Sequence, residues 1–457
     1  MRLFIPFTLL ASMLLTESTA FSQQATMPAQ GRDPNTGLAF QIRPPADGQP
    51  PLKEWIDKDT GHRVVRLSEE PNSESLYFHQ YCFSPDGNKL TYTAPTGIYQ
   101  VDLQSRKNEL ILAADITKDG QTLRNSIIQV GRKTGHIFFT RTVLTTEPAQ
   151  AGGGAVSQDR GSAERTVWWL DPVTKEEHQI GKLPLNHNLG TVNCDETLLA
   201  GAVLYLDGRG GAATQPVTAA PGQRINLQAR WAQHLPMELL TMNAKTGELK
   251  TFNPSNDWDN HFQFSPIDPT VLMYCHEGPW QNNDRVWTIN VDGTNLFKVH
   301  TRTMINEIWG HEFWSADGTM SWYQLQTPRG TGGVDWIAGT NLKTHEEIWY
   351  HLEAADVSIH VNVSRDGRLF TGDGNTQNPW IFLHTPHLAR NLAAGVYDAK
   401  GLIQPGYMDS EKLVNMSNHQ YALEPNVIFT PDEKWIIFRS NMFGPAYVFA
   451  VEVAKAR

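Results

Sequence analysis

One short pattern recurs six times along this chain of 457 residues, and it constrains the fold more than any other feature. In each copy an apolar or aromatic residue comes before a small polar residue, and a turn rich in Asp, Gly or Pro leads into a strand pattern. The copies are FSPDGNK from Phe83, NCDET from Asn193, FSPIDP from Phe264, FWSADGT from Phe313, VSRDGR from Val363 and FTPDEK from Phe429. Each is a hairpin signal, and its repetition indicates an all-β protein.

The spacing of the copies predicts a β-propeller. In the middle of the chain Asp268, Asp317 and Asp366 follow one another at intervals of 49 residues, and a period of roughly 40–50 residues built from short strands is typical of a propeller blade. The first two copies lie further apart, which leaves room for an unmarked copy near Lys133. The sequence therefore predicts a seven-bladed β-propeller. The alternative is a β-sandwich whose turns merely look alike.

Each end of the chain carries a strand pattern that lacks a neighbouring partner. One is EWIDKDTGHRVVRLS, from Glu54 to Ser68, and the other is YVFAVEV, from Tyr447 to Val453. Pairing them would leave no open sheet edge. We therefore expect the N- and C-terminal strands to complete one blade, with residues 63–67 beside residues 447–453.

The N-terminus predicts export from the cytoplasm. Met1 and Arg2 precede the apolar run LFIPFTLLASMLL and then small residues, as in a secretory signal of residues 1–22. That run is too short to span a bilayer. Residues 23–50 resemble a linker, and 51–457 form the predicted propeller domain. We expect a periplasmic or secreted protein with no membrane span.

Composition narrows the range of partners. The net charge of −10 argues against nucleic acid, which needs a concentrated basic surface. An acidic carbohydrate remains compatible, because a few cations in a pocket outweigh a screened global charge. Cys82, Cys194 and Cys275 form no cluster and are predicted to be buried thiols. Two segments rich in Gly, Ala and Pro, Gln150–Gly161 and Gly208–Gln223, are predicted insertions, and a helical turn follows the second. No oligomeric state follows from the sequence.

Polar side chains stand a few positions before nearly every repeat turn. They are His79 and Gln80, His187 and Asn188, Asn260 and His261, His311 and Glu312, His360, and His419, Gln420, Glu424 and Asn426. Any one histidine could simply bond a neighbouring loop, but as a set these side chains predict a site on the propeller axis. Imidazole, carboxylate and amide ligands together suit a divalent ion such as Mn²⁺. Neither HExxH nor GxSxG occurs, so a zinc protease or serine hydrolase is not favoured.

The runs around these residues resemble the oligogalacturonate lyases, polysaccharide lyase family 22. The likeness covers the chain from about Glu54 onwards and is strongest after Arg230. The runs that carry it include NHFQFSPIDPTVLMYCHEGPW from Asn260, DRVWTINVDG from Asp284, GHEFWSADG from Gly310, HVNVSRDGRLFTGDG from His360 and LEPNVIFTPDEKWIIFRSNMFGPAYVFAVE from Leu423. The resemblance implies a seven-bladed propeller that binds a manganese-like ion at its axis. It also implies cleavage of short oligogalacturonides by β-elimination.

The same resemblance implies roles for particular residues. The family's catalytic base falls on His261 and one metal ligand on His311. The family's remaining ligands, a glutamine and two histidines before an FTP turn, are replaced here by Tyr421, Glu424 and Asn426, and Gln420 lies one residue from the first of these. We expect the metal ligands His311, Glu424, Asn426 and Gln420.

The arginine that binds the substrate carboxylate in the family has no match at its expected place near Met237. Arg230 is the nearest candidate and is predicted as catalytic beside His261. We expect further substrate contacts from His79, His187, His276, His360 and Arg439. Arg285, Arg302 and Arg329 also lie near turns, where structural salt bridges are the competing role for them and for Arg439.

Elimination from a uronide makes physical demands that these residues can meet. Removing the C5 proton places more negative charge on the C6 carboxylate, so a divalent ion or an arginine must stabilise it. His261, with an ordinary pKa of about 6.5, can accept the proton when it is neutral. Two alternatives stay open. The substrate could be another uronide-containing glycan, or the chain could be a non-enzymatic binding propeller similar to the periplasmic TolB-type modules.

Overall fold

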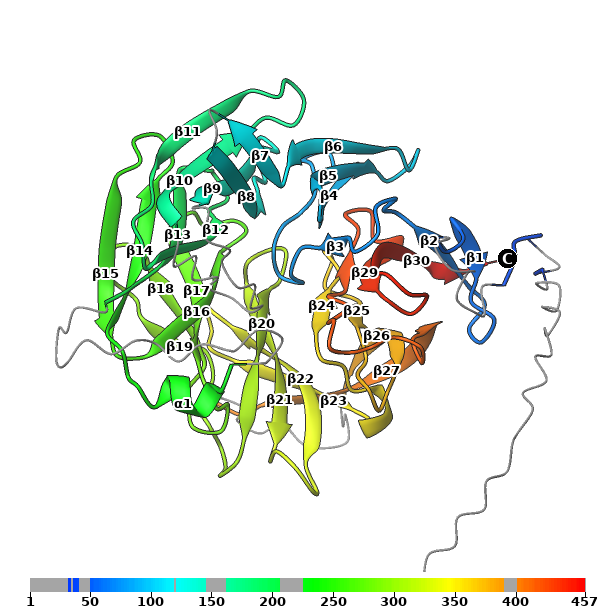
Figure 1. Cartoon of the computed structure of the whole chain (residues 1–457). Coiled ribbons are helices and arrows are strands. Elements are labelled where there is room, and N and C mark those ends of the chain that lie inside the picture. The colour runs from blue at the N-terminus through cyan, green and yellow to red at the C-terminus, as the bar shows by residue number, and fades with distance from the viewer. Residues whose placement is uncertain are drawn as a thin grey trace, which may run out of the picture.

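The computed structural model describes residues 32–33, 36–40, 50–118, 121–144, 162–205, 225–389 and 401–456. The predicted signal segment 1–22 and the two predicted insertions, 150–161 and 208–223, lie outside these residues, and of the predicted linker 23–50 only eight positions fall within them. Strands dominate the described chain and group into six sheets arranged like the blades of a propeller (Figure 1).

The first four sheets follow one another along the chain and are antiparallel. The first contains β3 (Glu74–Ser75), β4 (Lys89–Ala94), β5 (Gly97–Asp102) and β6 (Asn108–Ala113). The second contains β7 (Asp115–Lys118), β8 (Gln121–Val130), β9 (Ile137–Leu144), β10 (Ser162–Leu170) and β11 (Glu177–Lys182). The third contains β12 (His187–Val192), β13 (Leu198–Leu204), β14 (Met237–Asn243) and β15 (Leu249–Ser255). The fourth contains β16 (Trp258–Phe264), β17 (Val271–Glu277), β18 (Val286–Asn290) and β19 (Phe297–Lys298).

The fifth sheet has eight strands and is twice the size of a blade. It contains β20 (Ile308–Trp314), β21 (Met320–Thr327), β22 (Val334–Asn341), β23 (Glu347–Leu352), β24 (Val361–Val363), β25 (Phe370–Gly372), β26 (Trp380–Leu388) and β27 (Gln404–Asn415), with the short 3-10 helix η1 (Ala354–Asp356) after β23. Its two antiparallel halves join where β23 and β27 run parallel, with Ile348 opposite Gln404. The all-β, propeller-like arrangement agrees with the sequence, whereas the sheets as they are hydrogen-bonded number six in the described chain.

The sixth sheet confirms that the two ends of the chain close one blade. Its order is β1 (Glu54–Ile56), β2 (His62–Arg66), β30 (Tyr447–Lys455), β29 (Trp435–Ser440) and β28 (Ile428–Phe429). In the pairing of β2 with β30, Val64 lies opposite Val451 and Arg66 opposite Phe449. Trp55, Val64 and Val451 are buried in one apolar cluster, so the closure is held by packing as well as by hydrogen bonds.

The repeated turns owe their sequence to local hydrogen bonds. In the turn after Phe83, Ser84 Oγ donates to Asp86, whose Oδ1 also accepts the Asn88 N–H at 3.1 Å. Asp317 and Asp432 accept equivalent bonds from Ser315 and Thr430. In these three turns a small hydroxyl residue lies two positions before the acid to which it donates. The unmarked copy is present as a turn between β8 and β9, where Glu196 accepts the Lys133 and Thr134 N–H groups.

Apolar packing lies between neighbouring sheets. One cluster joins Ala200 and Leu239 of the third sheet to Phe264 and Leu272 of the fourth. The predicted helical turn is α1 (Leu227–Trp231), whose N-cap Asn226 accepts the Ala229 N–H at 2.9 Å. All three cysteines are free thiols, two of them buried and Cys194 half-buried. In the described residues, no helix is long and apolar enough to cross a membrane.

A buried ionic triad holds the start of β20, the strand that carries His311. His300 Nε2 lies 2.6 Å from Glu307 Oε1, and His300 Nδ1 lies 2.9 Å from Glu347 Oε2. Burial alone would lower the pKa of His300, but its bonds to Glu307 and Glu347 outweigh burial, so the pKa is raised. His300 is therefore held as an imidazolium between two carboxylates.

This triad predicts a pH-dependent stability. Because the folded pKa of His300 exceeds the unfolded value of about 6.5, the triad's contribution is fully present below pH ~6.5 and is lost as pH rises through the folded value. We expect His300→Gln to destabilise the fold by roughly 3–5 kcal/mol at low pH, as for other broken buried pairs. The difference from wild type in urea unfolding should shrink as pH rises. His351→Gln, at a half-exposed histidine, serves as the control, and a pH-independent difference would contradict the assignment.

Candidate functional site

β-Bulges set the direction of two of the site histidines, His261 and His311. His261, His311, His360 and Asn426 each stand three residues before the apolar residue that precedes the Ser or Thr of a repeat turn. The pairing of β16 with β17 slips between Asn260 and Gln263, and that of β20 with β21 slips between Gly310 and Phe313. A bulge of this kind re-aims a side chain that would otherwise alternate between the faces of the sheet.

The bulged positions also have an unusual backbone. The φ angles are +53° at His261, +51° at His311 and +55° at Asn426, in the left-handed region that few residues other than glycine adopt. Residues held in this region cluster at functional sites, where the surrounding structure imposes the conformation.

Four predicted histidines converge around an aromatic pair from the segment between β3 and β4. The ring of Tyr77 lies 4.9 Å from that of His79, 5.7 Å from His261 and 5.3 Å from His360, centroid to centroid. The ring of Phe78 stacks on His360 and lies 6.3 Å from His311. Tyr77 and Phe78 were not predicted as site residues, and their signal in the sequence is their position directly before His79 in LYFHQ.

His261 lies between two carboxylates. Its Nδ1 is 3.4 Å from Glu312 Oε1, and its Nε2 is 3.6 Å from Glu277 Oε2. Burial alone would lower the pKa of His261, but the bond to Glu312 and the charges of Glu312 and Glu277 outweigh it, so the pKa is raised. Glu312 is fully buried, and among the described residues its contact is the ion pair with His261 Nδ1 at 3.4 Å.

Glu277 belongs to a second ion pair. Arg285 Nη1 lies 2.8 Å from Glu277 Oε1, and both side chains are buried. Although burial opposes it, Arg285 and His261 lower the pKa of Glu277 to about 2. The adjacent Cys275 has its pKa raised by burial, so its thiol stays protonated. Glu277 is thus a permanent anion between one arginine and one histidine.

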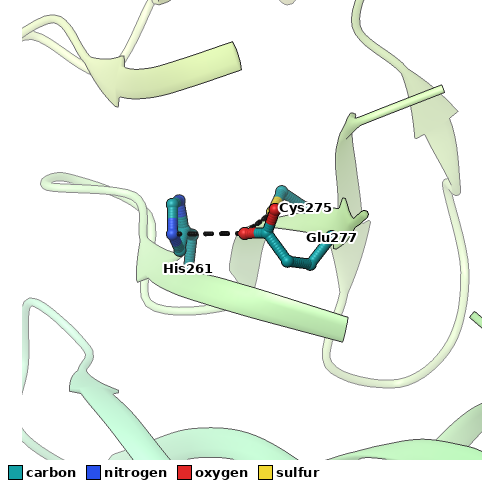
Figure 2. Close-up of side chains that lie close together, drawn as sticks. All are labelled: His261, Cys275 and Glu277. Carbon is teal, nitrogen blue, oxygen red and sulfur yellow. Dashed lines mark hydrogen bonds and ion pairs between the residues drawn. The ribbon is translucent and has the colours of Figure 1, made fainter. Parts of the chain in front are cut away.

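His261, Cys275 and Glu277 come close enough to suggest a metal site, because one ligand atom from each lies within 4.8 Å of the others (Figure 2). Arg285 argues against it. Its guanidinium donates to Glu277 and lies 3.6 Å from Cys275 Sγ. A metal ion bound there would be repelled by this positive charge at short range.

The other end of the cluster offers neutral imidazoles. His311 Nδ1 lies 2.7 Å from Gln324 Oε1, and the Gln324 amide is oriented by its bond to the Ser358 carbonyl. His360 Nδ1 lies 2.8 Å from Asp373 Oδ2. The Gln324 oxygen can only accept, so His311 Nδ1 carries the proton and its Nε2 presents a lone pair. Burial raises the pKa of Asp373 to about 7, and above that pH its carboxylate accepts from His360 Nδ1 in the same way. Burial in particular lowers the pKa of both histidines to about 3, which keeps them neutral.

Two predicted oxygen ligands lie beside these imidazoles. Glu424 Oε2 is 3.8 Å from His360 Nε2, and its side chain is one-third exposed. Asn426 is fully buried, and its Nδ2 donates to the Glu424 carbonyl at 3.3 Å. Its Oδ1 has no hydrogen-bond partner among the described residues. A buried oxygen that accepts no hydrogen bond is unfavourable unless a bound ion or molecule satisfies it. These residues therefore fit a cation.

Three predicted residues lie away from this cluster. Gln420 is exposed, and its backbone N–H donates to Asn441 Oδ1, so the prediction that it helps to hold a metal gains no support. His187 Nδ1 lies 3.2 Å from the Leu185 carbonyl oxygen, within its own turn. His276 lies between Asp257 and Asp259, at 3.7 and 3.5 Å. Both histidines therefore contact neighbouring residues, which was the alternative to binding substrate.

The predicted arginines take different roles. Arg439 pairs with Glu74 and donates through Nε to the Glu424 carbonyl at 2.7 Å, so it positions the backbone of a candidate ligand. Arg285 and Arg302 form the expected structural salt bridges. Arg230, on α1, is buried against the ring of Trp258 at 4.9 Å. No acid pairs with it in the described chain, and burial lowers its pKa to about 10.

A cavity of about 340 Å³ opens beside His311. Trp280, Trp336 and Arg329 line it, and the His311 ring lies 4.8 Å from that of Trp280. The exposed Arg329 and the acidic Asp335, which accepts from Gln326, both line the cavity. Aromatic walls with polar groups of both charges suit a small polar ligand with apolar faces, such as a sugar, and the volume lies within the range of small-molecule sites.

The fold and the site define a class of protein. It is an all-β propeller in which several blades contribute histidines and carboxylates to one site beside an aromatic cavity. The sequence profile of a family described as oligogalacturonate lyase matches residues 227–456. Because this match spans half of the chain, the chain belongs to the oligogalacturonate lyase family, which places it among the lyases.

Relatives and solved structures agree. The chain is 24% identical to the oligogalacturonate lyase of Dickeya dadantii over 87% of this chain and 95% of the relative. It is also 24% identical to the oligogalacturonide lyase of Pectobacterium atrosepticum, with the same shares. A structure described as an oligogalacturonate lyase in complex with manganese aligns over 88% of this chain and 96% of that one, with a TM-score of 0.64 and 22% identity. The oligogalacturonate lyase of Vibrio parahaemolyticus aligns equally well, at 21% identity.

The geometry predicts which end of the cluster binds a divalent ion. Cys275→Ser should leave the affinity for Mn²⁺ unchanged, because Arg285 already neutralises that end. His311→Ala should lower the affinity strongly. Calorimetric titration of both variants with Mn²⁺ tests this. Loss of Mn²⁺ binding in Cys275→Ser but not in His311→Ala would place the ion beside Cys275 and Glu277 and contradict the prediction.

Proposed function

We propose that this protein is a secreted or periplasmic lyase that cleaves oligogalacturonides by β-elimination. His261 acts as the base, and His311 helps to hold a divalent ion such as the manganese bound by the solved relative. The observation that carries the proposal is the placement of His261 and His311 in one buried cluster around Tyr77 and Phe78, with family membership behind it. We count the eight-stranded sheet as two blades, so that the propeller has seven.

His261 has the surroundings of a base. Its Nδ1 is buried beside Glu312 and its Nε2 faces Glu277 at 3.6 Å, so Nε2 can take the substrate proton only above the raised pKa of the ring, where the imidazole is neutral. When the ring takes up the C5 proton, Glu312 and Glu277 stabilise the imidazolium that forms. Burial, together with the charge of Glu424, raises the pKa of Tyr77 well above its ordinary value, so its hydroxyl keeps its proton and can donate to a sugar oxygen.

A divalent ion bound at the His311 end would supply positive charge beside the substrate carboxylate. His311, Glu424 and Asn426 would hold it: the Nδ1 of His311 is taken by Gln324, Glu424 Oε2 lies 3.8 Å from His360 Nε2, and Asn426 Oδ1 is buried without a donor in the described chain. Arg230 is the second source of charge. It is buried and has no acid partner in the described chain, so a substrate carboxylate would be its first ionic partner.

The cavity supports a uronide substrate. Its tryptophans can stack on sugar faces, and Arg329 at its rim can bind a carboxylate. A lyase of the same type acting on another uronide-containing glycan is the second candidate, favoured by Glu424 and Asn426 at positions where the family has histidines. A TolB-like binding propeller would need neither the buried cluster nor the cavity, and the family match argues against it.

The first test uses the ultraviolet absorbance of the 4,5-unsaturated product. Purified protein incubated with a panel of uronic acid oligosaccharides should produce this absorbance with oligogalacturonides. His261→Ala should lower the rate by roughly 10²–10⁴-fold, as expected for loss of a general base, and should still bind Mn²⁺. His311→Ala should lose both activity and binding.

His387→Ala, which changes a histidine paired with Asp409, is the matched control and should behave like wild type. Product formation with only another uronide would select the second candidate. Absence of product with every uronide tested would leave the binding propeller as the better account.

Arg230 gives a further prediction. Hydrogen bonds to charged groups contribute about 1.5–3 kcal/mol, so Arg230→Ala should lower kcat/KM on oligogalacturonides by roughly 10-fold or more. Arg230→Lys should recover part of this loss, because it keeps the charge but not the planar fork. Arg124→Ala, at an exposed arginine paired with Asp115, is the control. Unchanged kinetics in Arg230→Ala would leave the ion as the carboxylate's partner.

A further inference from the structure

His360 was predicted to bind substrate, but its surroundings indicate another role. The ring is fully buried and stacks on Phe78, with centroids 4.7 Å apart and planes inclined by 29°. Asp373 holds it from behind, since Oδ2 accepts from Nδ1 at 2.8 Å and Oδ1 accepts from the His360 backbone N–H at 2.7 Å. Only the Nε2 edge is left, and it faces Tyr77 Oη at 3.2 Å and Glu424 Oε2 at 3.8 Å.

His311, on β20, is held in the same way, and β20 and the β24 strand that follows His360 are the two edge strands of the eight-stranded sheet. Gln324 accepts from its Nδ1 at 2.7 Å, which leaves its Nε2 free. Histidines that bind metals typically donate their other ring N–H to a carboxylate or a carbonyl oxygen, which fixes the tautomer and the ring orientation. Both histidines meet this condition before any ion is present.

The separation of the two rings fits one ion. Their centroids are 4.6 Å apart and the planes are inclined by 52°. With metal–nitrogen bonds of about 2.1 Å, two imidazoles at right angles on one ion have centroids roughly 4.6 Å apart. Glu424 Oε2 lies 3.8 Å from His360 Nε2. Asn426, whose Oδ1 is buried without a donor in the described chain, donates its backbone N–H to Asp373 Oδ2, the same atom that accepts from His360 Nδ1.

We propose that His360 is a direct ligand of the divalent ion. His311 and His360 then supply two nitrogens through Nε2, and Glu424 and Asn426 supply oxygens, a mixed set that suits Mn²⁺. The inference deepens the proposed function and rests on its metal site. Glu424 and Asn426 stand in the segment before Phe429 where histidines were expected. His360 would restore one of these two nitrogen ligands.

The competing account is a core histidine satisfied by Asp373 and Tyr77. In the metal-free protein the Tyr77 hydroxyl donates to His360 Nε2, and an ion would have to displace that bond. Tyr77→Phe separates the two accounts. A ligand role predicts Mn²⁺ affinity that is unchanged or higher in this variant, because the competing donor is gone. A purely structural role predicts lower stability and weaker Mn²⁺ binding, through disorder of the site.

Pulsed electron paramagnetic resonance of bound Mn²⁺ counts the coordinated histidine nitrogens, and calorimetry measures the affinity. Wild type should show two nitrogens. His360→Gln should show one and bind Mn²⁺ at least about 10-fold more weakly, since even changes behind a ligand cost 10–100-fold. His261→Ala should keep both nitrogens. The control is His384→Gln, at a buried histidine of β26 bonded to Ser410, which should match wild type.

One nitrogen in wild type together with unchanged affinity in His360→Gln would overturn this inference, while the proposed lyase with its ion at His311 would stand. Failure of wild type to bind Mn²⁺ would overturn both. If His360→Gln does not fold, the nitrogen count of wild type and the Mn²⁺ affinity of Tyr77→Phe decide the question.

Discussion

The site depends on one feature of the backbone, the slip in strand pairing within β16 and β20, the two strands that carry His261 and His311. In β16 and β20 this slip coincides with left-handed backbone at His261 and His311. Without the extra residue, strict alternation would turn these side chains toward a neighbouring sheet, where the interior is apolar. The repeat that builds the propeller therefore also builds the site, because the same position recurs in successive inner strands.

The cluster is electrically divided. At the His261 end two buried carboxylates, Glu312 and Glu277, raise the pKa of the imidazole against the opposing effects of burial and of Arg285, which pairs with Glu277. At the His311 and His360 end burial keeps the imidazoles neutral, with their lone pairs presented. The proposed base must take up a proton, whereas the proposed ligands must stay neutral. Although all three residues are histidines, their different surroundings give them different pKa values. Tyr77 and Phe78 fill the space between the two ends.

Much of the fold follows from local chemistry. Ser84 and Asp86 show why the repeat turns could be predicted, since their hydrogen bonds lie within a few residues. Closure by the chain ends followed from two unpaired strand patterns. The parallel contact of β23 with β27 could not be predicted, because it joins residues far apart in sequence and no local pattern marks it. The same holds for Tyr77 beside His360, and for the burial that separates Asn426 from the exposed Gln420.

The proposed divalent ion lies between two preoriented histidines, His311 and His360. Its position can be measured by anomalous diffraction at the manganese edge from crystals of the full chain soaked in Mn²⁺. We expect a single strong peak between His311 Nε2 and His360 Nε2, within bonding distance of both. A peak between Cys275 and Glu277, or no ordered peak near the axis, would contradict this proposal.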